Sequence, residues 1–315
     1  ISNVLKKLKN IIYLSKRKKS LLINQLKRNI SYKLDFLLRS KNLKIAHIFA
    51  FAPFNSGDYM IGIATKYYFK KNILKDKEII FHDFDCRNGT LFNSKNIRNL
   101  NKYDYLIVGG GGLILPDTAP NKLSGWQWNI SIENLNLIKK PLYVISIGFN
   151  LFYRQNMSMT DRNSNKIDSS ITPIFKKSIK ALIKKSFYFS LRHKGDIKNL
   201  IKLIGSKYEN KLTYQPCPTI DYLEKKWYPK IKKSKREYIA IEVKDDREWR
   251  RYYKITKKVY YLHLLKFVKR AIKNKKKLCF LSHDGSTNFY NYLIENNIYL
   301  EILNCNTMNE KDILK

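Results

Sequence analysis

Four consecutive glycines end a strand-like run in YDYLIVGGGGLILPD, residues 103–117, of a chain that has only 12 glycines in 315 residues. Because glycine lacks a Cβ atom, backbone amides there can approach a phosphate or a sugar, and φ > 0 turns become accessible. No GK[ST] follows the run, and its spacing is not GxGxxG, so known phosphate-loop motifs are absent. Gly110, Gly111 and Gly112 are candidate binding residues. A tight strand exit with close packing is the alternative.

A second polar loop precedes an apolar-periodic helix pattern in FAPFNSGDYMIGIATKYYF, residues 51–69. Ser56 or Asp58 would cap this helix. The positive end of a helix dipole and its unpaired amides also favour an anionic ligand. We therefore expect Asn55, Gly57 and Asp58 to bind substrate, with helix capping as the simpler interpretation.

Charged side chains follow two other predicted strands. Arg192 closes SFYFSLR, and its planar guanidinium suits a carboxylate or a phosphate. A surface pair with a nearby carboxylate is the competing interpretation. His283 and Asp284 lie in LSHDGST. A histidine with an ordinary pKa near 6.5 can act as acid or base, or it can simply bond within the turn.

Two further patterns suggest sugar or nucleotide chemistry. HDFD places Asp83 and Asp85 in DxD spacing, which suits a divalent cation that bridges a nucleotide diphosphate. This favours a metal-dependent glycosyltransferase as the main alternative function. Trp126 and Trp128, in SGWQW, either stack on sugar rings or belong to the core.

The elements that must position these residues follow a strand–helix–strand order. Several runs are continuously apolar, which indicates strands buried on both faces of a parallel sheet. The charged stretch EKKWYPKIKKSKRE separates two series of such strands. We therefore expect an α/β protein with a basic segment at 1–41, one domain at 42–225 and a second domain at 235–315. The expected strands are 44–51, 78–84, 103–110, 141–149, 186–192, 238–243, 277–284 and 298–304.

Composition narrows the class of partner. The formal net charge is +37, which suits nucleic acid, an anionic membrane or acidic substrates. Lys, Asn and Ile are abundant throughout, however, so compositional bias is an equal explanation. No RNA- or DNA-binding module is recognisable, and we expect no nucleic-acid partner. A basic nucleic-acid or membrane-surface binding protein remains the second alternative.

The N-terminal segment and the cysteines bear on location. Residues 1–41 carry twelve Lys or Arg and one acid, Asp35, in a loosely amphipathic pattern. Such a segment suits an anionic membrane surface, and a solvated extension is the alternative. The four cysteines form no CxxC pair, so we expect neither zinc nor a disulfide framework. No apolar run is long enough to span a bilayer. We expect a cytoplasmic protein, peripheral at the inner face of the plasma membrane.

Six motifs occur in an order and spacing that resembles the polysaccharide pyruvyl transferase family: NSGDYMIGIATKYYF, YDYLIVGGGGLILPD, SGWQWNI, PLYVISIGFN, FSLRHKGD and QPCPT. The resemblance covers about residues 44–223 and continues faintly through FLSHDGST. It implies a GT-B-like fold, with two Rossmann-like domains whose parallel sheets face each other across a cleft. It also implies that phosphoenolpyruvate donates its pyruvyl group to two hydroxyls of a sugar, in a cell-surface polysaccharide or its lipid-linked precursor, to form a ketal.

The resemblance also assigns roles to single residues. Arg192 corresponds to the donor-binding arginine and His283 to a catalytic position, while Asn150 and Asp284 join the substrate-binding set. No metal and no cofactor are implied, since phosphoenolpyruvate is the donor substrate. Two features depart from the family pattern. Asp196 stands where an R-x-x-x-S motif has serine, and no C-terminal R-x-H motif is present, so we expect a truncated second domain.

Overall fold

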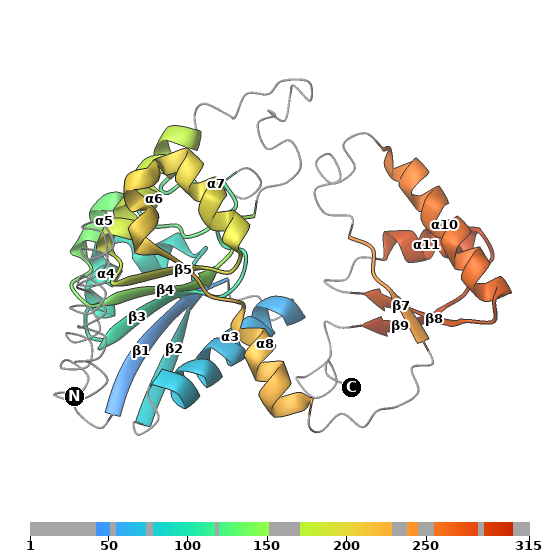
Figure 1. Ribbon diagram of the computed structural model, residues 1–315, viewed down its shortest axis with the longest axis horizontal. Helices are drawn as coiled ribbons and strands as arrows, with labels where there is room; N and C mark the ends of the chain where they lie inside the picture. Colours follow the sequence, from blue (N-terminus) through green and yellow to red (C-terminus); the bar gives the residue numbers. More distant parts are fainter. Residues whose placement is uncertain are drawn as a thin grey trace, which may run out of the picture. The chain divides into compact units, whose positions relative to one another are not determined.

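The computed structural model describes residues 42–50, 55–73, 78–116, 120–150, 171–228, 238–244, 255–282 and 287–304. The chain divides into two compact units, Ile1–Leu43 and Lys44–Lys315. The strands of the described residues form two separate sheets (Figure 1). The predicted basic segment 1–41 and the candidate residues His283 and Asp284 lie outside the described residues.

The larger sheet has six strands in the order β2-β1-β3-β4-β5-β6, and its pairings from β1 through β6 are parallel. All five residues of β3 are buried, as the continuous apolar run predicts for a central parallel strand. Its strands are β1 (Asn42–Phe49), β2 (Glu78–Asp85), β3 (Tyr105–Gly109), β4 (Leu142–Ile147), β5 (Tyr188–Leu191) and β6 (Leu212–Tyr214).

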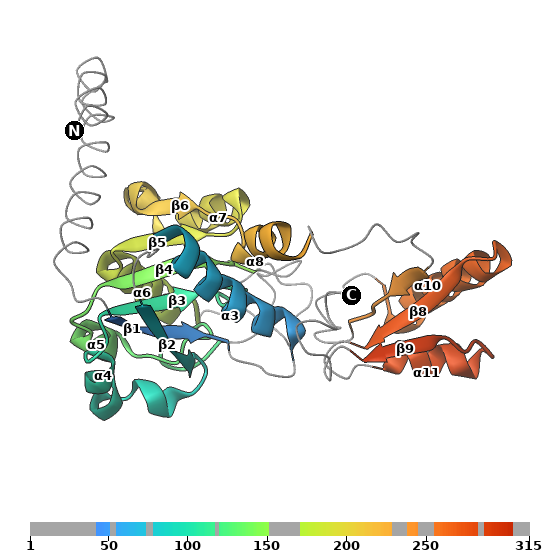
Figure 2. The ribbon, with the colours of Figure 1, turned by 90° about the horizontal axis from the view of Figure 1, so that it is seen from below.

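Helices cover both faces of this sheet (Figures 1 and 2). On one face lie α4 (Ser94–Leu100), α5 (Ile132–Leu137), α6 (Ile171–Lys185) and α7 (Lys194–Ile204). Their apolar residues share one core with alternate residues of the strands, such as Ile48, Val108 and Val144. On the other face, α3 (Ser56–Tyr68) packs against α8 (Pro218–Tyr222) through Met60, Ala64 and Tyr222.

The smaller sheet is also parallel, in the order β7-β8-β9. Its core includes Phe280 and Phe289, and the aromatic side chains of α10 and α11 meet there. The elements are β7 (Tyr238–Ile241), α10 (Lys257–Lys273), β8 (Lys277–Ser282), α11 (Asn288–Glu295) and β9 (Glu301–Asn304). The predicted α/β class with two parallel sheets is confirmed.

Short helical segments complete the larger unit. They are the π-helices Phe69–Ile73 and Leu223–Trp227, and the 3-10 helices Gly89–Phe92 and Ser206–Lys211. The stretch YQPCPTIDYL contains α8, which begins at Pro218, a position where the missing N–H of proline costs nothing. Among the described helices, none combines the length and apolar character that crossing a bilayer requires.

The strand order determines where a ligand can enter the larger sheet. The chain passes from β1 outward to β2, then returns to the other side of β1 at β3. The carboxyl ends of β1 and β3 therefore lead into connections that run in opposite directions. Such a topological switch point leaves a crevice beyond the strand ends, which is where open parallel sheets bind ligands. The Asn55 loop follows β1, and the glycine run follows β3.

Candidate active site

The glycine run forms a turn that disfavours side chains. Gly109, Gly110 and Gly111 have φ values of 128°, 74° and 89°, which other residues rarely adopt. A Cβ atom at Gly110 would lie 2.0 Å from Cγ2 of Ile61 on α3, and one at Gly112 would lie 2.0 Å from Nδ2 of Asn150. The run therefore lets the backbone pass close to α3 and to the loop after β4.

The backbone groups of this turn differ in whether they form hydrogen bonds. The Gly110 amide donates to the Ile145 carbonyl at 2.9 Å, and the Gly111 carbonyl accepts from the Gly148 amide at 2.7 Å. Among the described residues, the Gly111 and Gly112 amides donate no hydrogen bond. Successive unpaired amides in a left-handed turn form a concave site for an anion.

Arg192 lies beside the same turn. Its Nη2 donates to Oδ1 of Asn150 at 2.9 Å, and a Cβ atom at Gly112 would lie 3.3 Å from Nη2. The guanidinium lies over Gly148, where a Cβ atom would be 2.4 Å from Nε. This Nε is buried and has no hydrogen-bond partner. Because an unsatisfied buried donor of a charged group is costly, an anion that accepts from Nε would stabilise the arrangement.

The Asn55 loop is joined to this site through α3. Asn55 is the N-cap, and its Oδ1 accepts from the amides of Gly57 at 3.0 Å and Asp58 at 3.2 Å. The prediction that Ser56 or Asp58 caps the helix is therefore wrong, since the asparagine carbonyl one residue earlier reaches both amides. Asp58 Oδ1 lies 3.8 Å from the position of a Gly111 Cβ atom, which places its carboxylate at the glycine turn.

Asp196, the departure from the family pattern, has a structural contact. It lies in the first turn of α7, and its Oδ2 accepts from the Phe149 amide at 3.1 Å. The carboxylate thus holds the chain immediately after β4, between Gly148 and Asn150. Burial raises the pKa of Asp196, although this hydrogen bond and the charges of His193 and Arg192 oppose the rise.

A buried histidine, His47, contacts the peptide at which the glycine turn begins. His47 on β1 is fully buried and stacks on the Phe49 ring, with centroids 4.3 Å apart. Its Nε2 lies 2.9 Å from the Gly109 carbonyl, and its Nδ1 lies 3.7 Å from Oδ1 of Asp83. This contact fixes the peptide at which the glycine turn begins. Burial would raise the pKa of Asp83, but the nearby His47 ring and the hydrogen-bonded Lys66 ammonium lower it overall.

Asp83 and Asp85, which the sequence suggests as a metal site, form ion pairs with basic side chains. Asp83 pairs with Lys66 at 2.5 Å, and Asp85 pairs with Nε of Arg87 at 2.9 Å. Within the described ranges, no group of three His, Cys, Asp or Glu could hold a metal ion. These contacts do not favour the metal-dependent glycosyltransferase.

The tryptophan pair is part of the core. Trp126 and Trp128 are 1% and 0% exposed and pack edge to face. The suggestion that they stack on sugar rings is therefore wrong, because no ring face is accessible. Cys86, Cys217 and Cys279 are free thiols, so no disulfide joins the cysteines that the structure describes.

The strand ends therefore bring together six of the ten predicted site residues: Asp58, Gly110, Gly111, Gly112, Asn150 and Arg192. Asn55 and Gly57 form the adjoining turn. Sequence reasoning missed Gly148 and His47. Gly148 follows ISI at a strand end, which is a usable signal. Nothing in the sequence distinguishes His47 from an ordinary strand residue.

The fold and this site define a parallel α/β protein with unpaired donors for an anion at its strand ends. Residues 55–311 match the sequence model of the family described as polysaccharide pyruvyl transferase. The match covers most of the 315 residues, and the chain belongs to the polysaccharide pyruvyl transferase family. A search of curated proteins finds no match.

Three of the solved structures with partial similarity are UDP-N-acetylglucosamine 2-epimerases. UDP-N-acetylglucosamine 2-epimerase from Rickettsia bellii is 13% identical, with 86% of this chain and 70% of that chain covered and a TM-score of 0.46. UDP-GlcNAc 2-epimerase from Neisseria meningitidis, bound to UDP-GlcNAc, is 10% identical, with 86% and 74% covered and a TM-score of 0.42. The enzyme from Methanocaldococcus jannaschii is 12% identical, with 86% and 75% covered and a TM-score of 0.41. Similarity at this level implies no shared function.

Proposed function

We propose that this protein transfers the pyruvyl group of phosphoenolpyruvate to two hydroxyls of a sugar, in a cell-surface polysaccharide or its lipid-linked precursor. Membership of the family supports the reaction class. The observation that carries the donor assignment is the buried, unpartnered Nε of Arg192 beside the unpaired amides of Gly111 and Gly112. A guanidinium beside backbone amides that form no hydrogen bond suits a small dianion that bears a phosphate and a carboxylate.

The reaction needs protons to move at two places. Protonation of the donor's methylene carbon makes C2 electrophilic, and one sugar hydroxyl attacks C2 as it loses its proton. The C2–O bond to phosphate then breaks, the second hydroxyl closes the ketal, and its proton leaves with the phosphate. Two hydroxyl protons are thus balanced by one new C–H bond and one phosphate proton.

We assign these proton transfers to His283 and to carboxylates near the acceptor. Asp58, whose carboxylate lies at the glycine turn, is the group best situated to accept a hydrogen bond from a sugar hydroxyl. His283 and Asp284 lie outside the described residues, and their roles rest on the family resemblance. No metal and no further cofactor enter this proposal.

Donor binding can be tested without knowing the acceptor. Phosphoenolpyruvate affinity would be measured by calorimetry for the full-length protein, for Arg192→Ala and for Arg98→Ala, which removes an exposed arginine of α4. Loss of a charge-assisted hydrogen bond predicts at least about a tenfold weaker affinity in Arg192→Ala. Equal affinities for all three proteins would remove Arg192 from the donor site.

We also propose that the protein works in the cytoplasm and contacts the inner face of the plasma membrane through residues 1–41. The support is the charge of this segment alone, since basic side chains are attracted to anionic lipid. Sedimentation with phosphatidylglycerol vesicles should fall when residues 1–41 are deleted. Unchanged sedimentation of the shortened protein would contradict this part of the proposal and leave the donor site unaffected.

A further inference from the structure

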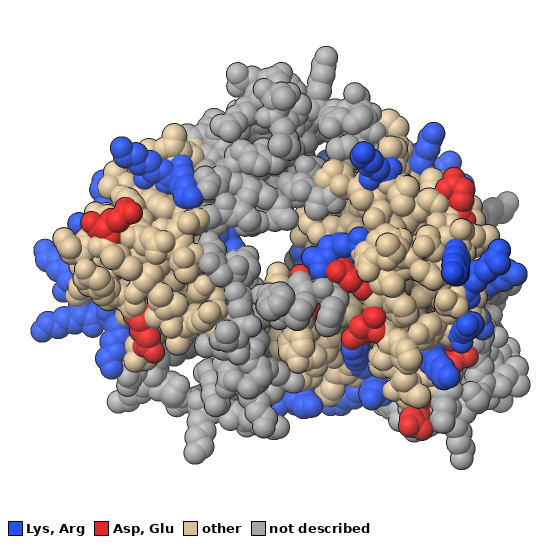
Figure 3. Space-filling model, turned by 180° about the vertical axis from the view of Figure 1, so that it is seen from behind, with Lys and Arg blue, Asp and Glu red and all other residues tan. Residues whose placement is uncertain are grey.

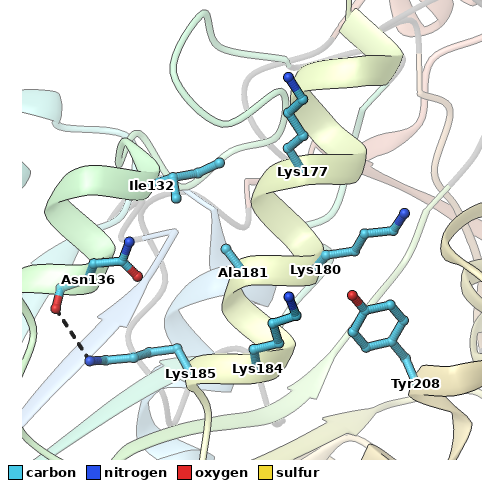
Figure 4. A pocket seen from close by; sticks show the side chains of 8 residues that line it. All are labelled: Ile132, Asn136, Lys177, Lys180, Ala181, Lys184, Lys185 and Tyr208. Atoms are coloured by element: carbon cyan, nitrogen blue, oxygen red, sulfur yellow. Dashed lines mark hydrogen bonds between the residues drawn. The ribbon is translucent and has the colours of Figure 1, made fainter.

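A hollow lies among the helices of the larger sheet, on the face that carries α5 and α6 (Figure 4). Its volume is about 560 Å³, within the range of small-molecule sites. The lining residues come from α5, α6 and the 3-10 helix after α7: Ile132, Asn136, Lys177, Lys180, Ala181, Lys184, Lys185 and Tyr208.

The lining is basic and contains no carboxylate. Lys185 donates to the Asn136 carbonyl at 3.4 Å, whereas Lys177, Lys180 and Lys184 form no ion pair within the described residues. The nearest acid along α5 is Glu133, and its pKa is lowered by its own backbone amide and by the Ser131 hydroxyl. On the face that Figure 3 shows, Lys and Arg are spread over the surface with Asp and Glu among them. The hollow is lined by four lysines and by no carboxylate.

The spacing of the three unpaired lysines limits the shape of a ligand. They stand at positions i, i+3 and i+7 of α6, which extends them along the helix for roughly 10 Å. A single phosphate ion would have to draw the three ammonium groups together from along the helix, so a compact anion suits this spacing less well. A chain with anionic groups at intervals can contact them all.

We propose that this hollow binds an acidic stretch of the polysaccharide acceptor, with sugar carboxylates paired to Lys177, Lys180 and Lys184. This inference rests on the proposed function. Figure 4 shows the Tyr208 hydroxyl directed toward α6 and the Asn136 side chain at the opposite end of the lining, so groups that can bond sugar hydroxyls accompany the ammonium groups. A recessed surface accommodates a polymer chain better than it accommodates a flat bilayer.

The test compares two triple variants with the same change in charge. Lys177→Ala/Lys180→Ala/Lys184→Ala removes the unpaired lysines of the hollow. Lys266→Ala/Lys269→Ala/Lys273→Ala removes exposed lysines at the same i, i+3, i+7 spacing on α10. The probes are galacturonate oligomers and neutral maltose oligomers of equal length, titrated by calorimetry into the full chain. All three proteins would first be compared by circular dichroism and thermal unfolding.

We expect the unsubstituted protein to prefer the galacturonate oligomer, because each ammonium–carboxylate pair adds a modest gain. The α6 variant should bind it at least about tenfold more weakly, and the α10 variant less than about twofold more weakly. Equal losses in both variants would overturn the inference, since they would indicate general charge attraction. Preference for a single-stranded DNA oligomer or phosphatidylserine vesicles that depends on the α6 lysines would also overturn it, in favour of those partners.

The proposed function is tested separately in the same proteins. If phosphoenolpyruvate fails to bind the unsubstituted chain, the donor assignment fails whatever the oligomers do. If phosphoenolpyruvate binds and depends on Arg192, but the α6 substitutions leave galacturonate binding unchanged, the hollow alone loses its role.

Discussion

The strand-end site and the lysine hollow are both basic, yet they are constructed in opposite ways. Arg192 is held by Asn150 over Gly148, and its buried Nε has no hydrogen-bond partner among the described residues. Lys177 and Lys184 are exposed and have no ion-pair partner among the described residues. A fixed guanidinium selects ligands by their geometry, whereas exposed ammonium groups select ligands by their total charge. Ligand affinity at the strand-end site should therefore change when a single methyl group is added nearby. Ligand affinity at the hollow should change only with the number of lysine charges.

The largest effect should come from Gly148→Ala. The new methyl would lie 2.4 Å from Arg192 Nε, so the guanidinium must leave its position. Because the clash is with the end of a flexible side chain, we expect little change in the free energy of unfolding but at least about a tenfold loss in phosphoenolpyruvate affinity. Calorimetry measures the phosphoenolpyruvate affinity, and denaturant unfolding measures the free energy of unfolding.

Gly195→Ala provides the matched control, since a Cβ atom there meets nothing within 4 Å. It should retain full donor affinity. If Gly148→Ala also retained it, the donor site would be as tolerant as the hollow, and the contrast between the two regions would disappear.

A smaller loss is expected for Asn150→Ala, which removes one hydrogen bond to Arg192. A hydrogen bond to a charged group contributes about 1.5 kcal/mol or more, and partial compensation by water reduces the loss, so we expect a roughly fivefold weaker donor affinity. Asn150→Ala with unchanged affinity would show that Gly148 and Asp196 alone position the guanidinium. Titration of phosphoenolpyruvate against both proteins decides this.

Asp196→Asn should change the dependence of stability on pH. Because burial raises the pKa of Asp196 in the folded state, the folded protein binds its proton more tightly than the unfolded chain. Stability therefore falls as pH rises from the ordinary carboxyl pKa of about 3.9 through the raised folded value, and is level above it. The asparagine variant lacks this fall.

Unfolding by urea at pH 3 to 7 provides the measurement for this carboxyl. Asp196→Asn should match the unsubstituted protein at the acid end and be more stable near neutral pH. If the variant instead became progressively less stable than the unsubstituted protein toward neutral pH, the buried charge would be favourable, and folding would lower the pKa of Asp196 rather than raise it.

The smallest effect should come from one lysine of the hollow. Lys184→Ala removes an exposed side chain without an ion-pair partner in the described structure, so its free energy of unfolding should change by less than about 0.5 kcal/mol. Its galacturonate affinity should fall less than about fivefold. Suppose that Lys184→Ala weakened galacturonate affinity as much as Gly148→Ala weakens phosphoenolpyruvate affinity. That result would mean that Lys184 is held as rigidly as Arg192.

Continuous apolar runs made most of the fold predictable. All eight expected strands exist, and β3 and β4, which are buried on both faces, are apolar almost throughout. Several expected C-terminal ends extend past the true ones, as in 141–149 against Leu142–Ile147, since Gly148 and Phe149 are apolar but already follow the strand. β6 was not predicted, because a strand of three residues leaves no periodicity to detect. How the two predicted domains face each other stays a prediction.

The candidate site was predictable in part for the same reason. Strand ends identify which loops meet, so the glycine run, Asn150 and Arg192 could be placed at one edge. Sequence patterns do not determine where a side chain points. They therefore could not reveal that Asn55 caps α3 or that Asp196 binds the Phe149 amide. Nor could it separate buried Trp126 and Trp128 from exposed sugar-stacking rings.

The crowding around the glycine turn has a genetic consequence. Asparagine or arginine can be replaced by another donor if a neighbour changes with it, but glycine has no smaller substitute. At Gly110 and Gly112 even alanine would come within 2.0 Å of an existing atom. Inactivating missense alleles should therefore concentrate there.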